Sequence, residues 1–189
     1  YQIPSRSMVP GLQVGDFVLV NKHAYGLKFP GTNYLISDLN YPQRNDVAVF
    51  IPPHTLCDTE ATEARPDLSL LSTAESQLFL KKFTSLQESR CTPGGIKFVK
   101  RIMGIPGDKV EIKGYEIWIN GNKINQKLLS SNKDENLLEE TLDQEVHVVR
   151  TLGLSEYAQH SWEVPQGFYL AIGDNRDNSL DSRAWGYFS

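Results

Sequence analysis

The chain has 189 residues, of which 40% are hydrophobic and 22% charged, a composition typical of a globular protein rather than of a disordered segment. Its net charge of −4 and the lack of any run of five basic residues argue against a nucleic-acid partner and against electrostatic capture by an anionic membrane. No stretch approaches the roughly 18 apolar residues of a membrane-spanning helix, and the N-terminal residues lack the pattern of a targeting segment.

Short β-like segments dominate the chain. Alternating or continuous apolar patterns predict strands at 17–20, 47–51, 96–102, 109–112, 116–119 and 168–172. Asn120-Gly121 lies between two short extended runs and predicts a hairpin, because both central residues of a type I′ turn need positive φ. The expected fold class is therefore mostly β.

Two segments interrupt this pattern. In the first, at about 53–95, Ser72 and Glu75 match a capping box, and the apolar residues that follow predict one short helix. The second, residues 126–160, is polar and weakly periodic. We therefore expect a β-rich core over 1–110 with an insertion at about 53–95, a less regular β-rich excursion over 111–165, and a return to the core over 166–189.

The two cysteines flank the predicted helix. Cys57 and Cys91 lie 34 residues apart and match no zinc-site spacing. In an oxidising compartment they could form a disulfide worth about 4 kcal/mol by loop closure. The alternative, two buried free thiols, stays open.

A candidate nucleophile lies near the N-terminus. Ser5 and Ser7 sit between Pro4 and Pro10, which predict a locally rigid segment, and a rigid exposed hydroxyl suits a nucleophile. Such serines can also simply satisfy the backbone of a turn. A serine nucleophile needs a base, and the four histidines are scattered outside any distinctive motif: His23, His54, His147 and His160.

A lysine can replace histidine as the base if it is neutral. At its ordinary pKa of about 10.4, only about one lysine in a thousand is neutral near pH 7.5. Lys100 follows Val99 and precedes Arg101 and Ile102 on a predicted strand, where burial would lower its pKa. Lys97 lies on the opposite face and is expected to be solvated.

The polar run 173–183 is too charged to be core. It could be mistaken for a calcium loop, but Arg176 stands at the third position of that template and no glycine stands at the sixth. Asp174, Asp177 and Asp181 are better suited to pair with nearby arginines. A plain solvated turn is the remaining interpretation.

Taken together and in this order, four segments resemble the boxes of the type I signal peptidase family, SxSMxPTL, RGDxxVF, KRxxGxPGD and GDNRDNSxDSR. They are residues 5–12, 44–50, 100–108 and 173–183. The last is matched at every defined position and is the most specific. Gly11 and Asn45 depart from the family pattern, and the 53–95 insertion is longer than the family leads us to expect.

The resemblance implies a membrane-associated Ser/Lys endopeptidase that removes signal peptides from exported preproteins after small residues at the first and third positions before the cut. Ser7 would be the nucleophile and Lys100 the base; Ser5 would help to form the oxyanion hole and Ser179 would orient the amine. Arg101 with Asp174, and Asp181 with Arg183, would brace the site. Substrate pockets would use Tyr1, Ile3, Pro4, Met8, Phe98 and Val99.

The resemblance also implies no metal or other cofactor, an upstream membrane anchor, apolar contact with the lipid bilayer, and a location on the outer, periplasmic face of a bacterial inner membrane. Two other classes remain as alternatives. A self-cleaving repressor-type Ser–Lys protease shares the nucleophile logic but lacks the last box. A catalytically dead homologue that binds apolar peptides would not need all four residues of the proposed site.

Overall fold

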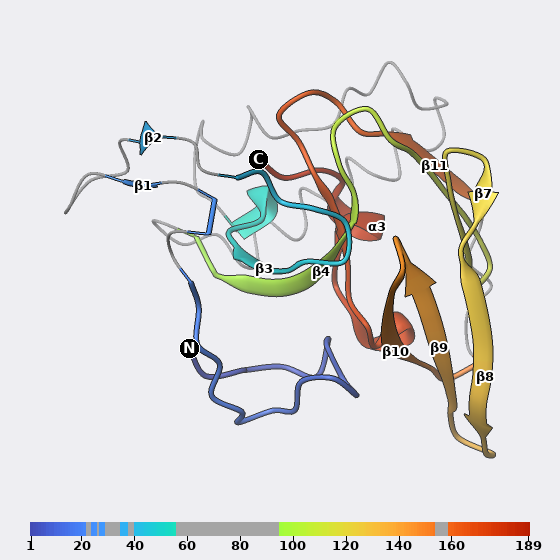
Figure 1. Ribbon diagram of the computed structural model, residues 1–189. Coiled ribbons are helices and arrows are strands. Elements are labelled where there is room, and N and C mark those ends of the chain that lie inside the picture. Colours follow the sequence, from blue (N-terminus) through green and yellow to red (C-terminus); the bar gives the residue numbers. More distant parts are fainter. Residues whose placement is uncertain (22–23, 26, 29–34, 38–39, 56–94, 154–158) are drawn as a thin grey trace.

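The computed structural model describes residues 1–21, 24–25, 27–28, 35–37, 40–55, 95–153 and 159–189 (Figure 1). These residues are mostly β, as predicted, and form four antiparallel sheets. The predicted 72–86 helix, Cys57, Cys91 and His23 lie outside the described residues. Within the described part of the chain, no helix is long and apolar enough to cross a membrane.

The first sheet has the order β12-β4-β3 and comes from three predicted segments. Its strands are β3 (Val47–Phe50), β4 (Phe98–Gly104) and β12 (Leu170–Ile172). β4 is the central strand, and its Ile102 and Met103 are fully buried. Adjacent residues of a strand face opposite sides, so both faces of the sheet are covered at this point.

The second sheet confirms the predicted hairpin. It has the order β11-β5-β6-β7, with β5 (Lys109–Lys113), β6 (Glu116–Ile119), β7 (Asn122–Lys123) and β11 (His160–Glu163). Asn120 and Gly121 have φ of 52° and 80°, the left-handed conformation that the type I′ turn requires. Alternate residues of β5 and β6 enter an apolar cluster with β4 and β12: Val110, Ile112, Ile117 and Ile119.

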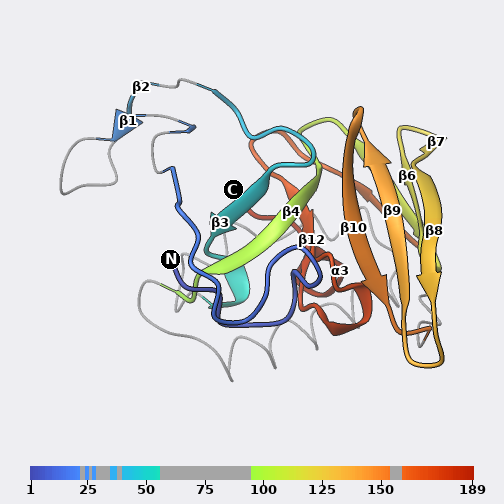
Figure 2. The ribbon, with the colours of Figure 1, turned by 60° about the horizontal axis from the view of Figure 1, so that its bottom comes forward.

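The third sheet differs from expectation. Residues 126–160 were expected to be less regular, yet they contain most of a sheet of order β10-β9-β8 with three seven-residue strands, β8 (Asn125–Ser131), β9 (Asn136–Leu142) and β10 (Glu145–Thr151). The apolar alternation is weak because Glu140 and His147 occupy buried positions on neighbouring strands. Figure 2 shows these strands side by side at one end of the molecule.

The N-terminal segment forms less strand than predicted. Phe17 makes only an isolated antiparallel bridge with Gln2, although 17–20 was expected to be a strand. The pairing stops at Ile3 because the next residue, Pro4, has no N–H to donate. Residues 27–28 and 35–37 form a separate two-stranded sheet, β1 (Leu27–Lys28) and β2 (Leu35–Ser37). The domain boundaries proposed from the sequence stay a prediction.

Candidate active site

The segment that carries Ser7 is anchored from both sides. Met8 is 1% exposed and packs in an apolar cluster with Ile3 and Val99. On the other side, the backbone N–H of Asn175 donates to the Ser7 carbonyl at 3.0 Å, and its side-chain amide donates to the Arg6 carbonyl at 2.9 Å. Ser7 is thus held between the core and the loop 173–183.

Lys100 lies opposite this serine on the central strand β4. It is 3% exposed, and its Nζ donates to Ser7 Oγ at 2.6 Å and to the Val99 carbonyl at 3.0 Å. Burial lowers the pKa of the Lys100 amine to about 8, although the carboxylates of Asp181 and Asp174 act in the opposite direction. Near neutral pH a useful fraction of this lysine is therefore unprotonated.

Ser5 and Ser179 also lie near the pair. Ser5 Oγ is 3.3 Å from Ser7 Oγ, and either oxygen can be the donor. Ser179 Oγ is buried and makes no hydrogen bond to the Lys100 amine; it lies close enough to the Asp181 carboxylate to help lower the pKa of Asp181. The orienting role of Ser179 stays a prediction.

Both ion pairs that the family resemblance implies are present. Arg101 donates from Nε and Nη2 to the two carboxylate oxygens of Asp174 at 2.9 and 2.7 Å. Its Nη1 also donates to the Asn45 carbonyl at 2.9 Å, where φ of 74° lets Asn45 turn the chain. This arrangement ties β4 to the loop 173–183 one residue after Lys100.

Asp181 and Arg183 form the second pair, at the start of α3 (Ser182–Trp185). Arg183 donates to the two Asp181 oxygens at 2.8 and 2.7 Å, and the Gly173 N–H donates to Asp181 at 3.0 Å. Burial alone would raise the pKa of Asp181, but the charge and hydrogen bonds of Arg183 and the Gly173 N–H outweigh it, and the pKa lies below its usual range. Asp177 accepts from Tyr115 Oη and the Leu152 N–H. The three aspartates of the run are therefore engaged by protein donors.

The residues assigned to the substrate pockets differ in how deeply they are buried. Ile3, Met8 and Val99 share one buried cluster below the serine segment. Tyr1 is 40% exposed and its hydroxyl donates to the Lys97 carbonyl at 3.2 Å. Pro4 is exposed and Phe98 is half-buried. Their role in substrate binding stays a prediction.

The described histidines do not contact Ser7. His54 is fully buried between the rings of Phe98 and Trp185, His147 contacts Glu140, and His160 stacks on Trp162. No group of three His, Cys, Asp or Glu side chains within the described ranges is placed to hold a metal ion.

Gly173 is a site residue that the sequence argument did not single out individually. A Cβ at this position would lie 2.1 Å from Ser179 Oγ and 2.5 Å from the Ser7 carbonyl oxygen. Asn175 was likewise missed, although both residues lie inside the most specific box. Gly173 and Asn175 act through backbone contacts, so apart from the match to that box no residue pattern in the sequence could have indicated their roles.

We expect Gly173→Ala to lower kcat about 100-fold, because the added methyl must displace the Ser7 backbone and a shift of about 1 Å costs that much. Gly11→Ala is the matched control, since its Cβ would find its nearest atoms at 3.7 Å. Cleavage kinetics of the two folded variants would check this. Equal rates for both would show that the close approach at Gly173 does not matter.

A serine hydroxyl held against a buried lysine amine can act as a nucleophile with a built-in base, so the site is that of a candidate serine hydrolase without a catalytic histidine. The family described as signal peptidase, peptidase S26, matches residues 1–189. The chain belongs to this peptidase family.

Individual relatives agree with this assignment. Signal peptidase I of Pseudomonas aeruginosa is 34% identical, with 98% of this chain and 54% of that protein covered. Signal peptidase I of Haemophilus influenzae is 32% identical, with 99% and 58% covered. The chain thus spans little more than half the length of these relatives. A solved structure of a signal peptidase I from Enterococcus faecalis is 23% identical, with a TM-score of 0.38, and covers 80% of this chain and 92% of that one.

Proposed function

We propose that this chain is the catalytic part of a serine endopeptidase that removes signal peptides from exported preproteins. The observation that carries the proposal is the 2.6 Å hydrogen bond between Ser7 Oγ and the amine of buried Lys100. Family membership supplies the reaction class, and the geometry supplies a nucleophile and a base in contact.

In the proposed reaction, neutral Lys100 takes the Ser7 proton as Oγ attacks the scissile carbonyl. The resulting ammonium group protonates the leaving amine, and water then attacks the acyl-enzyme by the reverse relay. The hydroxyl of Ser5, close to Ser7 Oγ, and the backbone N–H of Ser7 would stabilise the oxyanion.

The preferred substrates would carry small residues at the first and third positions before the cut. We assign the substrate pockets to the buried cluster of Ile3, Met8 and Val99 and to the more exposed Tyr1, Pro4 and Phe98. A large side chain would have to displace buried groups and would bind poorly.

The function is tested by incubating the protein with a preprotein that has an Ala-x-Ala cleavage site and measuring product masses. We expect one cut directly after the second alanine. If the preprotein stays intact in the presence of folded protein, the proposed activity is refuted. The remaining function would then be that of a homologue that binds apolar peptides without cleaving them.

We also propose that the domain works at the outer face of a bacterial inner membrane and touches lipid through an apolar patch of Val14, Phe17 and Leu19. These side chains are 53%, 83% and 103% exposed. They follow the serine segment, and Phe17 bridges to Gln2. Single apolar side chains on a surface are ordinary, but three exposed ones within residues 14–19, soon after the serine segment in the chain, suit a lipid-facing role.

Lipid binding should be weak and nearly independent of salt, because the chain carries a net charge of −4 and apolar contact must supply the affinity. Vesicle co-sedimentation at low and high salt would measure it. Phe17→Ser with Leu19→Ser should abolish binding, whereas Leu128→Ser with Leu129→Ser, two exposed leucines of β8, should not. Binding that disappears as salt rises would contradict the apolar contact.

A further inference from the structure

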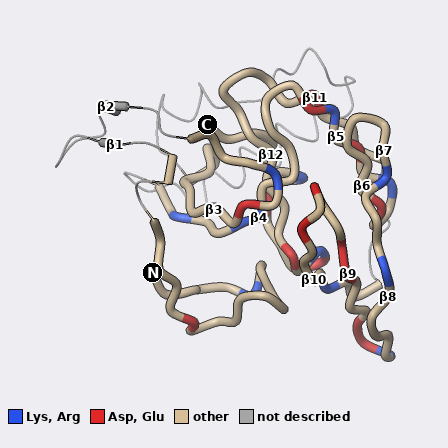
Figure 3. The backbone as a smooth tube through the Cα atoms, viewed as in Figure 1, with Lys and Arg blue, Asp and Glu red and all other residues tan. Residues whose placement is uncertain are grey.

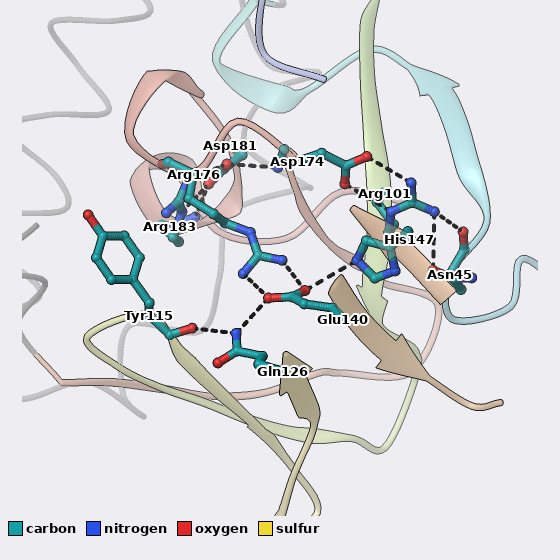
Figure 4. Close-up of polar contacts among 11 residues, drawn as sticks. Asn45, Arg101, Tyr115, Gln126, Glu140, His147, Asp174, Arg176, Asp181 and Arg183 are labelled. Carbon is teal, nitrogen blue, oxygen red and sulfur yellow. Dashed lines mark hydrogen bonds and ion pairs between the residues drawn. The ribbon is translucent and has the colours of Figure 1, made fainter. Parts of the chain in front are cut away.

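A third ion pair joins a residue outside the four boxes to a residue inside the last box. Glu140, on β9, is fully buried and receives both terminal nitrogens of Arg176, which is 3% exposed and begins η3 (Arg176–Asn178) (Figure 4). The Arg176 Nη1 to Glu140 Oε1 distance is 2.7 Å. Glu140 belongs to the third sheet, β10-β9-β8, called the excursion sheet below, and Arg176 belongs to the loop 173–183.

Neighbouring side chains of the excursion sheet stabilise the ionised carboxylate of Glu140. Gln126 and His147 are its direct cross-strand neighbours on β8 and β10, and both side chains contact the Glu140 carboxylate, at 2.6 and 3.2 Å. Burial by itself would raise the pKa of Glu140, but the charge of Arg176 and the hydrogen bonds from His147, Arg176 and Gln126 lower it to about 2. The carboxylate is therefore ionised at any working pH.

From Arg176 the contacts lead to both halves of the reacting pair. The preceding residue, Asn175, donates its backbone N–H to the Ser7 carbonyl. The Arg176 carbonyl accepts from Arg183 Nη2 at 2.7 Å, and Arg183 holds Asp181, one of the two carboxylates that favour the charged form of Lys100. A shift of the Arg176 backbone would thus move the serine and the carboxylate together.

The excursion also meets the loop on both sides of Arg176. Arg150 of β10 donates its N–H to the Asp174 carbonyl at 2.8 Å, and Tyr115 Oη donates to Asp177. Figure 3 shows acidic and basic residues together where β9 and β10 approach this part of the chain. These contacts hold the loop against the excursion, and the buried Arg176–Glu140 ion pair forms between the two contact points along the loop.

We propose that Glu140 is a positioning residue of the peptidase reaction, acting through Arg176 to hold the loop that carries Asn175, Ser179 and Asp181 against Ser7 and Lys100. This rests on the proposed function. It gives the excursion sheet a role in turnover rather than in substrate binding, because none of the residues assigned to the substrate pockets contacts Glu140.

The test compares three variants in preprotein cleavage and in denaturant unfolding. Glu140→Gln should lower kcat at least tenfold with KM within about twofold, and should unfold at lower denaturant, because it leaves the buried Arg176 charge without its partner. The double variant Glu140→Leu with Arg176→Met removes both charges and should unfold at a higher midpoint than Glu140→Gln, although Gln126 and His147 lose their partner, yet it should keep the low kcat. Glu139→Gln, the neighbour on the opposite face of β9, should match the parent.

The outcomes separate the two claims. A parent protein that leaves the preprotein intact overturns the proposed function and, with it, this inference. If the parent cleaves, a double variant that regains full kcat shows that the pair is only structural and overturns the positioning role. Unchanged kcat in Glu140→Gln, or a raised KM with unchanged kcat, overturns it as well. If Glu140→Gln does not fold, the kcat of the double variant decides.

Discussion

Lys100→Met and Ser7→Ala should each lower kcat/KM for preprotein cleavage by at least about 10⁴-fold, since each removes one half of a proton relay whose members act as a unit. The two effects should not add in the double variant. Methionine fills the space of the lysine stem, so the central position on β4 stays packed. Cleavage kinetics, with circular dichroism to confirm folding, measure this.

Lys97→Met is the matched control for that experiment. Lys97 is exposed and lies one residue before β4, and it should be replaceable with little loss. Turnover that survives in folded Lys100→Met would contradict the assignment of the base. Loss of turnover in Lys97→Met would show that the assay responds to any change on this segment.

The same Lys100→Met variant should be more stable than the parent at pH 7, by up to about 3 kcal/mol, because burial lowers the lysine pKa from 10.5 to about 8 and each pKa unit corresponds to about 1.4 kcal/mol. Lost hydrogen bonds to Ser7 and Val99 would reduce this gain. Burying Lys100 is thus expected to lower the stability of the folded chain while it makes the amine more reactive.

Because the pKa of Lys100 is lower in the folded chain, the stability gain of Lys100→Met depends on pH in one direction. The unfolded chain holds the lysine proton more tightly than the folded chain, so the parent becomes more stable as pH rises from about 8 to 10.5. The advantage of Lys100→Met is therefore complete below pH 8 and disappears above 10.5. Urea unfolding of both proteins across this range measures the difference. A difference that stays constant with pH would contradict a buried, titrating amine.

Strands with apolar alternation could be predicted from the sequence, and those without it could not. β5 and β6 bury alternate aliphatic residues, and their hairpin turn is encoded by Asn120-Gly121. On β9 and β10 the inward positions include Glu140 and His147, which look like surface residues until Arg176 is placed beside them. Periodicity cannot register a core position that is filled by a charge.

The contact between Ser7 and Lys100, the proposed reacting groups, could be predicted because their residue types carry the chemistry. Ser7 and Lys100 are 93 residues apart in the chain and were linked only through the resemblance of the four boxes. Gly173 and Asn175 act through close approach and backbone hydrogen bonds, which any sequence pattern leaves unspecified. Glu140 lies outside the boxes and has no local motif.

The pH dependence of cleavage tests most directly whether neutral Lys100 activates Ser7. We expect kcat/KM to rise with pH through a single apparent pKa of about 8, well below that of an ordinary lysine, because only the unprotonated amine can accept the serine proton. The same profile should persist when His23, His54, His147 and His160 are all replaced by glutamine in a protein that remains folded. A rise centred near pH 6.5, the usual range of histidine, that disappears in the histidine-free protein would contradict the lysine base.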